Sequence, residues 1–147
     1  MNESAAISGL PRSGLLRRLG ALLYDALLLT AVWMIGTAVL LPLTGGEAIE
    51  GVWRPLFQLY IVGLTFGFFA LFWIRGGQTL GMKAWRIRVQ RPDGSPLELS
   101  DALRRFLFAA PAMLLGGIGL LWLLFDRDRL ALHDRLSQTE VVLVPAS

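Results

Sequence analysis

An acidic side chain inside an apolar stretch is the first feature of this sequence that could do chemistry. Asp25 interrupts a run that is otherwise uncharged from Leu19 to Leu43. A carboxylate at the centre of a membrane span costs about 2.5 to 3.5 kcal/mol on insertion scales, so such residues are rare and functional by default. Arg18 lies seven residues earlier, which on a helix returns to nearly the same face. Arg18, Ala21 and Asp25 should therefore line one stripe that faces protein.

Arg18 and Asp25 are not expected to pair with each other. Partners within one helix lie three or four residues apart, whereas this spacing corresponds to roughly 10 Å of helical rise. Each side chain therefore needs a partner from elsewhere in the chain. Simpler interpretations stay open, because Arg18 could reach toward lipid headgroups and Asp25 could make a polar contact near the cytoplasmic face.

The remaining candidates lie outside the apolar runs. Asp134 belongs to the C-terminal tail and would be a solvated carboxylate unless the fold gives it a partner. His133 is the only histidine, and because a single imidazole is a poor metal site, we expect neither a metal nor a cofactor. The absence of cysteine excludes disulfides and thiolate metal sites. No residue resembles a nucleophile beside a positioned base, so an enzyme is the least favoured class.

Helices in a bilayer must position these residues. The chain has 147 residues, of which 54% are hydrophobic and 17% charged, and this is too apolar for an ordinary soluble domain. Uncharged runs cover residues 26–43, 55–74 and 106–125. Twenty helical residues are about 30 Å long, which matches the hydrocarbon core of a bilayer. We predict an all-α membrane protein, with an N-terminal transmembrane helical hairpin (about 19–43 and 55–74) and a third hydrophobic segment.

The distribution of charge predicts the orientation in the membrane. Short loops rich in Lys and Arg remain in the cytoplasm. Basic residues precede the first run, and residues 75–105 hold seven Lys and Arg, whereas the connection between the first two runs carries Glu47 and Glu50. We therefore expect a cytoplasmic N-terminus and a cytoplasmic loop over residues 75–105. This topology also explains the net charge of +3, so nucleic acid is not an expected partner.

The third hydrophobic segment leaves two topologies open. A full crossing would put the tail, residues 126–147, outside the cell, although Arg127, Arg129 and Arg135 favour the cytoplasm. Alternatively, the segment enters the membrane and returns on the same side, since Pro111 and the glycines that follow it weaken a straight helix.

Two short segments have the composition of β-strands. Residues 85–90 alternate apolar and polar side chains and end at a turn over residues 91–94, and residues 139–144 are rich in β-branched side chains. The first segment could form a local β-hairpin, or the two segments could pair as a small cytoplasmic β-ribbon that holds the tail beside the loop. Before the third run, Ser100 and Asp101 have the pattern of an N-cap and an acidic first turn.

Four motifs in this order resemble the RDD family of bacterial membrane proteins. They are Arg18, Asp25 seven residues later, the segment Gly-Gln-Thr-Leu-Gly-Met-Lys at 77–83 and the segment Leu-His-Asp-Arg-Leu-Ser-Gln-Thr at 132–139. The resemblance covers about residues 12 to 144. The family is named for one Arg and two Asp, and the resemblance assigns these roles to Arg18, Asp25 and Asp134.

The resemblance implies one membrane domain over residues 1–147, in the bacterial cytoplasmic (inner) membrane. It implies a supporting cytoplasmic motif made of Gln78, Thr79, Gly81 and Lys83. Family members often have the lysine directly after the glycine, whereas Met82 intervenes here. The activity proposed for the family, transport of ions or small ligands including cation/proton exchange, becomes an expectation for this chain.

Two functional hypotheses follow. In the first, Asp25 binds a monovalent cation or a proton, with Arg18 and Asp134 as electrostatic partners. Two or three helices do not readily enclose a pathway, so this hypothesis requires a homo-oligomer or a partner membrane subunit. In the second, the three charged residues form one buried network that locks the hairpin to the ribbon, and the protein is an assembly or scaffold module.

Overall fold

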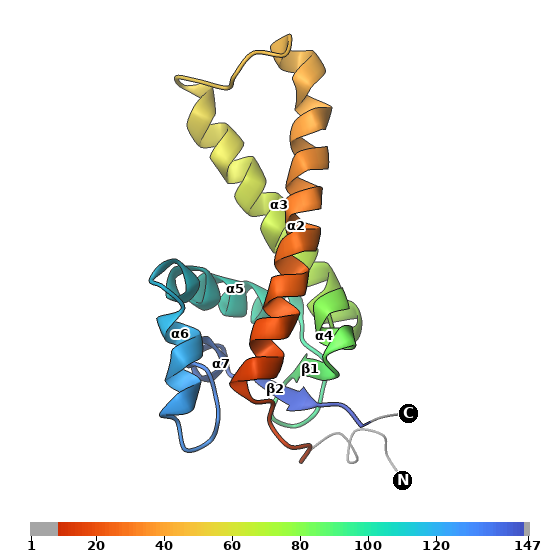
Figure 1. Cartoon of the computed structure of the whole chain (residues 1–147), viewed down its shortest axis with the longest axis vertical. Coiled ribbons are helices and arrows are strands. Elements are labelled where there is room, and N and C mark those ends of the chain that lie inside the picture. The colour runs from red at the N-terminus through yellow and green to blue at the C-terminus, as the bar shows by residue number, and fades with distance from the viewer. Residues whose placement is uncertain (1–8, 146–147) are drawn as a thin grey trace.

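A long helical hairpin dominates the computed structural model, which describes residues 9–145 (Figure 1). Its arms are α2 (Leu15–Thr44) and α3 (Trp53–Gly76), which at 1.5 Å per residue are roughly 45 and 36 Å long. Both helices are long and apolar enough to cross a membrane. Most of their side chains are exposed, as expected of helices that are hydrophobic all round and face lipid. The predicted helical membrane fold with an N-terminal hairpin is confirmed.

The two arms of the hairpin contact each other through a glycine and two hydrogen bonds. Gly36 of α2 packs against Leu64 and Tyr60 of α3. The Tyr60 hydroxyl donates to the Gly36 carbonyl oxygen at 3.1 Å, and Trp33 Nε1 donates to Thr65 Oγ1 at 2.9 Å. These bonds fix the separation of the arms well away from the base of the molecule.

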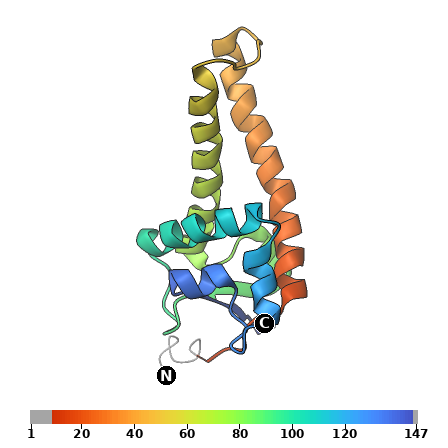
Figure 2. The same ribbon diagram turned by 90° about the vertical axis from the view of Figure 1, so that its left-hand side faces the viewer.

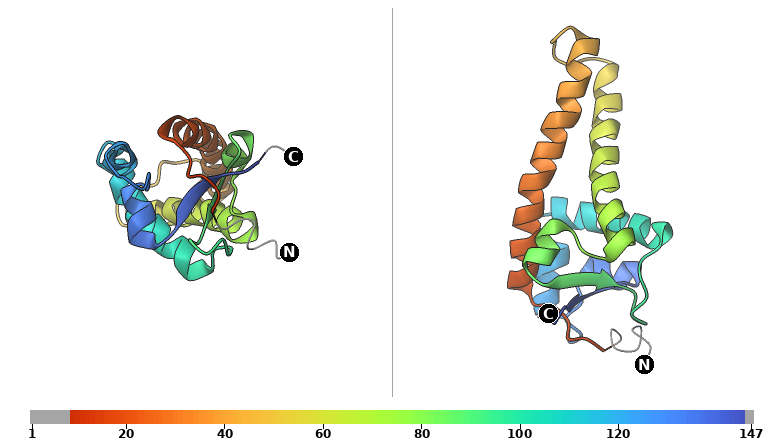
Figure 3. Two further views of the ribbon diagram at one scale, coloured as in Figure 1. Left: turned by 90° about the horizontal axis from the view of Figure 1, so that it is seen from below. Right: turned by 90° about the vertical axis from the view of Figure 1, so that its right-hand side faces the viewer.

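A two-stranded antiparallel sheet lies at the base of the hairpin (Figures 1 and 3). The short helix α4 (Leu80–Ala84) follows α3, and β1 (Ile87–Gln90) then pairs with β2 (Glu140–Leu143). The N-terminal segment runs along the sheet as well, because the Ser13 backbone N–H donates to the Val141 carbonyl oxygen at 2.9 Å. The predicted pairing of the loop with the tail is therefore confirmed, and the local β-hairpin is not formed.

The third hydrophobic segment is bent. Helix α5 (Leu99–Leu114) meets the pair formed by α6 (Ile118–Leu121) and the 3₁₀ helix η1 (Trp122–Leu124) at 103°. Figure 2 shows α5 lying across the hairpin instead of along it. The break falls at Gly116 and Gly117, which have positive φ angles of 79° and 77°, a conformation that glycine adopts at little cost. Only if the bent pair is taken as one span does the number of candidate crossings rise from two to three.

The two ends of the bent segment lie at the same end of the hairpin. After η1 the chain passes through α7 (Leu132–Ser137) into β2, and β2 pairs with β1, which precedes α5. This geometry favours a segment that enters and returns over a full third crossing. Pro111 lies inside α5 without ending it, so the turn depends on the two glycines and not on the proline.

Helix α5 begins earlier than the sequence indicated. It starts at Leu99 with Glu98 as its N-cap residue, so the prediction of Ser100 as the N-cap is wrong. Asp101 is instead the third helical residue, and its side chain accepts a hydrogen bond from the Glu98 backbone N–H at 2.9 Å. A carboxylate at this position satisfies a backbone donor that has no partner within the helix. The polar start of α5 therefore belongs to the helix and not to the loop.

The packed core of the protein lies at the base of the hairpin. There a cluster of buried apolar side chains joins both arms of the hairpin to the sheet and to α5; its buried members are Ala21, Ala70, Trp73, Ile87, Val89, Leu97, Ala102 and Val141. Burial of apolar side chains away from both water and lipid gives the base a fixed shape. The residues that could do chemistry surround this core.

Candidate functional site

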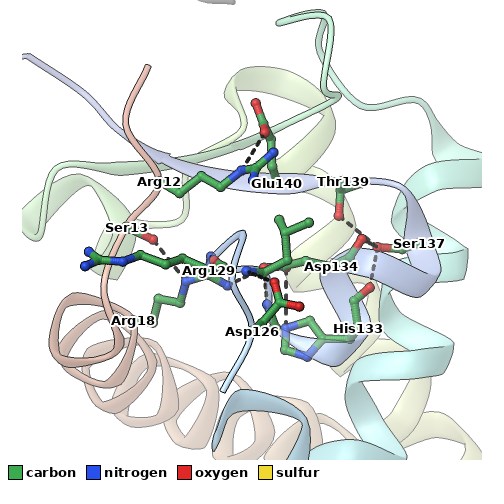
Figure 4. Close-up of polar contacts among 12 residues, drawn as sticks. Arg12, Ser13, Arg18, Asp126, Arg129, His133, Asp134, Ser137, Thr139 and Glu140 are labelled. Atoms are coloured by element: carbon green, nitrogen blue, oxygen red, sulfur yellow. Dashed lines mark hydrogen bonds and ion pairs between the residues drawn. The ribbon is translucent and has the colours of Figure 1, made fainter. Parts of the chain in front are cut away.

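A buried carboxylate shared by two arginines joins three distant parts of the chain. Asp134 is fully buried and accepts a hydrogen bond from Arg18 Nη1 at its Oδ2 and another from Arg105 Nη1 at its Oδ1, the latter at 2.5 Å. Arg18 belongs to α2, Arg105 to α5 and Asp134 to α7 (Figure 4 shows the Arg18 side). We call these three residues the Arg–Asp–Arg cluster. It fixes the tail against the start of the hairpin.

Local structure explains how the members of the cluster are positioned. Asp134 is the third residue of α7 and also accepts a hydrogen bond from the Ala131 backbone N–H at 3.1 Å, which stabilises the start of that short helix. Arg18 lies in the first turn of α2, and its Nε donates to the buried hydroxyl of Ser13 at 3.0 Å. Each side chain is therefore also positioned by a hydrogen bond to a residue that just precedes its own helix.

The charges of the cluster determine its ionisation. Burial alone would raise the pKa of the Asp134 carboxyl, but the charges of Arg105 and Arg18 outweigh burial and hold that pKa well below its usual range. The neighbouring His133 imidazole is also buried, and burial together with the Arg105 charge lowers its pKa to about 4. At neutral pH, His133 is thus uncharged, and the cluster carries two positive charges and one negative charge.

Arg105 is a site residue that the sequence analysis missed. Its Nη1 also donates to Thr139 Oγ1 at 2.7 Å, and its guanidinium lies over the Trp73 ring at 5.2 Å from the ring centroid. In the sequence it counted only as one of the loop charges. Ala102, Arg105 and Ala112 share the buried face of α5, so helical spacing within an amphipathic segment was the signal that could have found it.

The second carboxylate, Asp25, has different partners. It is buried on α2 and accepts hydrogen bonds from Thr79 Oγ1 and, at 2.9 Å, from the Gly81 backbone N–H. Thr79 is the N-cap of α4, and its hydroxyl also accepts a hydrogen bond from the Met82 backbone N–H at 3.1 Å. A free N–H at the start of a helix is a natural partner for a carboxylate. We call Asp25, Thr79 and Gly81 the Asp25 site.

The motif at 77–83 supports this contact in part. Gln78 Nε2 donates to the Ile87 carbonyl oxygen at 2.9 Å and so ties the motif to β1. A Cβ atom at Gly81 would collide with the Ala21 carbonyl oxygen and with the Asp25 carboxylate. Lys83 is exposed on α4, and its hydrogen bonds within residues 9–145 are made by backbone atoms, with Thr79 and Arg86. Gln78, Thr79 and Gly81 thus belong to the arrangement, and the Lys83 side chain does not.

The charged residues form two groups and not one. Arg18, Ala21 and Asp25 line a buried stripe of α2, as predicted, and Arg18 does find its partner elsewhere. However, the partners of Asp25 are on α4, whereas those of Asp134 are on α2 and α5. The structure thus brings Arg18 and Asp134 together, and it places Asp25 in a second group with α4.

An apolar cavity connects the two groups. It has a volume of about 490 Å³ and lies between the hairpin and α5. Its walls are apolar side chains of α2, α3 and α5, and the charged residues Arg18, Asp25 and Arg105 line it near the base. Along α2 the lining extends from Arg18 to Trp33, roughly 22 Å of helix. We call this space the hairpin cavity. Within residues 9–145, no group of three or more acidic, histidine or cysteine side chains is arranged to hold a metal ion.

The fold and the site together define a class of protein, an integral membrane protein whose helical hairpin stands on a base held by buried Arg–Asp contacts. Residues 12–138 match the model of the RDD family. Because this match covers most of the chain, the protein belongs to the RDD family, and the resemblance found in the sequence is confirmed. No curated protein and no solved structure matches the chain.

Proposed function

We propose that this protein is a non-enzymatic transport subunit of the bacterial cytoplasmic membrane, in which Asp25 binds a proton or a monovalent cation during movement of an ion or small ligand. The observation that carries the proposal is the environment of Asp25. This carboxylate is buried in a spanning helix and lines the hairpin cavity, and its hydrogen-bond partners among residues 9–145 are neutral, namely the Thr79 hydroxyl and the Gly81 N–H. An intramembrane carboxylate without a fixed cationic partner is suited to exchange a proton or a cation.

The proposed orientation places the base of the hairpin in the cytoplasm. The loop with α4 and β1 and the tail with β2 share that end of the molecule (Figure 1), and both are rich in Lys and Arg. Glu47 and Glu50 lie at the opposite end, between α2 and α3. This distribution supports a cytoplasmic N-terminus by the positive-inside rule.

An assembly of several copies, or a partner membrane subunit, is part of the proposal. Two spanning helices do not enclose a pathway by themselves, and the hairpin presents exposed apolar side chains along most of its length. Gly63 and Gly67 of α3 are exposed, with nothing in the described residues within 4 Å of a Cβ built on either. Small residues at this spacing allow close approach of a helix from another subunit. Native mass spectrometry of the protein in lipid nanodiscs measures the number of copies.

Proton-coupled flux in vesicles tests the role of Asp25. The purified protein is reconstituted with an internal pH dye, and Na⁺ or K⁺ gradients are applied to the wild type, to Asp25→Asn and to Thr30→Ala. Thr30 is the matched control, because it lies on α2 and its hydroxyl bonds the Ala26 carbonyl oxygen of its own helix. We expect flux in the wild type and in Thr30→Ala, and its loss in Asp25→Asn. A wild type that moves protons with neither cation contradicts the proposal.

The Arg–Asp–Arg cluster favours a second candidate function, that of a membrane assembly or scaffold module. The cluster ties α2, α5 and α7 into one rigid base. Buried ion pairs can specify one arrangement of helices even where they add little stability. Under this alternative, Asp25→Asn has no effect on flux because there is none, whereas Asp134→Asn disrupts assembly with other copies or a partner subunit. Native gel electrophoresis of membranes extracted in mild detergent distinguishes the two outcomes.

A further inference from the structure

Two side chains that line the hairpin cavity carry buried donors that no group in residues 9–145 uses. Arg105 and Trp73 both line it, and their residues are only 4% and 5% exposed. Within the described part of the chain, Arg105 Nε and Trp73 Nε1 are buried without a hydrogen-bond partner. A buried donor without a partner costs roughly 1 to 3 kcal/mol. Two such donors in one cavity therefore point to a group that comes from outside the chain.

The geometry of Arg105 indicates what kind of group this is. Both of its hydrogen bonds, to Asp134 and to Thr139, use the single nitrogen Nη1. The edge formed by Nε and Nη2 is the fork that binds two oxygens of a carboxylate or phosphate side by side. The Trp73 ring lies against the same guanidinium, with the ring centroid 5.2 Å from Arg105 Cζ. Because guanidinium and indole N–H groups can only donate, a ligand that binds both donors must offer acceptor atoms.

The local charge favours an anionic acceptor over a neutral one. Asp134 is shared by Arg18 and Arg105, so the cluster has one positive charge in excess beside the hairpin cavity. Asp25 also lines the cavity, but its two oxygens accept hydrogen bonds from α4, namely from Thr79 and Gly81. An anion at Arg105 would therefore neutralise the excess charge without displacing any bond that the protein already makes.

The shape and polarity of the remaining cavity indicate an apolar chain. Its volume of about 490 Å³ lies in the range of roughly 300 to 1,000 Å³ that is typical of ligand sites. The walls beyond Arg105 are formed by side chains such as Leu29, Phe69 and Met113, and the lining continues along α2 as far as Trp33. The cavity thus has a cationic end near the base and an apolar length that runs into the membrane-spanning part of the hairpin.

We propose that the hairpin cavity binds an anionic amphiphile, whose carboxylate or phosphate lies on the Nε–Nη2 edge of Arg105 and on the Trp73 indole N–H, and whose apolar chain lies between α2, α3 and α5. A free fatty acid and a membrane phospholipid share this chemistry. The inference goes beyond the transport proposal, because binding is an equilibrium property that requires neither flux nor ionisation of Asp25.

Equilibrium binding to the full-length protein in uncharged detergent tests the proposal. The probe is radiolabelled palmitate, and the competitors are hexadecanol, which has the same chain without the charge, and phosphatidylglycerol. We expect palmitate or phosphatidylglycerol to bind at least about tenfold more tightly than hexadecanol, as a charge-assisted hydrogen-bonded contact requires. Preference for palmitate identifies a fatty-acid site, and preference for phosphatidylglycerol identifies a phospholipid site.

Two tryptophan variants separate the specific contact from general packing. Trp73→Phe keeps an aromatic ring and removes the unpartnered donor, whereas Trp33→Phe removes a donor that lines the same cavity but already bonds Thr65 Oγ1. We expect Trp73→Phe to reduce the preference for the anion at least about fivefold, and Trp33→Phe to leave it unchanged. Arg105→Lys, which keeps the charge and loses the fork, should reduce the preference as well.

The proposal is overturned by any of three results obtained with protein that keeps its wild-type circular dichroism spectrum. These are equal binding of hexadecanol and both anions, identical effects of Trp73→Phe and Trp33→Phe, and no measurable binding of either anion. The binding assay contains no ion gradient, so loss of flux in Asp25→Asn with unchanged palmitate or phosphatidylglycerol affinity leaves the binding site intact. The two proposals therefore fail separately.

Discussion

Two buried aspartates in this protein differ in the charge of their partners. Asp134 accepts hydrogen bonds from two arginines and a backbone N–H, and its charge is fully compensated. Asp25 accepts hydrogen bonds from two neutral groups. A carboxylate held between two guanidinium groups is fixed in its ionised form, whereas one with neutral partners can lose its charge more easily. We therefore assign the structural role to Asp134 and the ion-binding role of the transport proposal to Asp25.

Replacement of Asp134 is expected to destabilise the protein strongly. Asp134→Asn leaves two buried guanidinium groups with no carboxylate, and breaking a buried ion pair from one side costs roughly 3 to 5 kcal/mol. Thermal unfolding in mild detergent, followed by circular dichroism, measures the loss. The control is Asp128→Asn, because Asp128 pairs with Arg135 at the surface, where both side chains are about half exposed, and surface ion pairs contribute little. Equal effects of the two changes would contradict the structural role.

The stability of the protein should fall in mild acid because of His133. Its pKa is lowered from 6.5 to about 4 in the fold, so between these values the unfolded chain binds a proton that the folded protein does not. The contribution is complete above pH 6.5 and is lost as the pH falls toward 4, by at most about 3 kcal/mol. Because His133 is the only histidine, His133→Gln should reduce the fall of the unfolding temperature between pH 6.5 and 5. An unchanged slope in this variant contradicts the burial of a neutral imidazole.

At the scale of the elements, the short helix α4 explains why Asp25 and Asp134 are separated. Its first turn lies on α2, where Gly81 is in contact with the Ala21 carbonyl oxygen and the Asp25 carboxylate. The absence of a side chain at Gly81 allows this approach. The following strand β1 then pairs with β2, so the position of α4 also influences where the tail is anchored.

A methyl group at Gly81 should push α4 away from α2. Gly81→Ala places a Cβ atom against the Asp25 carboxylate and against the Ala21 carbonyl oxygen, a backbone atom that cannot rotate away, and such overpacking costs typically about 1 to 3 kcal/mol. Gly76→Ala is the matched control, since a Cβ atom at Gly76 meets nothing within 4 Å. Thermal unfolding of both variants checks the prediction. A Gly81→Ala protein as stable as Gly76→Ala would show that the close contact is not required.

The whole molecule consists of a packed base and a hairpin that projects from it. The base contains the sheet, the bent segment, Asp25 and Asp134, and it is held by contacts between residues far apart in the sequence. The hairpin is held mainly by the backbone hydrogen bonds of its own helices, as a bilayer requires of any spanning segment. Because the bent segment returns to the base, we predict that the hairpin alone crosses the membrane.

Cysteine accessibility tests this two-crossing topology. The chain has no cysteine of its own, so Glu47→Cys, Lys83→Cys and Leu136→Cys each provide a single label site at an exposed position. An impermeant maleimide should label Glu47→Cys in intact cells, and it should label the other two only after permeabilisation. Labelling of Leu136→Cys in intact cells would instead mean that the segment of α5 and α6 crosses the membrane completely.

Much of the fold could be predicted from local properties of the sequence. Hydrophobicity over the length of a bilayer determined the hairpin, and β-branched composition located both strands, because these signals reside in neighbouring residues. Local properties did not predict that Lys83 is exposed or that α5 starts at Leu99. Both features depend on how α4 and α5 pack against the other elements of the base.

The sequence by itself determined that Arg18, Ala21 and Asp25 share a protein-facing stripe, because helical periodicity fixes relative directions along one element. Only the tertiary structure decided which residues meet that stripe. Arg105 became the second partner of Asp134, and Thr79 with Gly81 became the partners of Asp25. Spacing within one helix carries no information on contacts between residues more than a hundred positions apart, such as Arg18 and Asp134. Those contacts follow from the packing of the whole base.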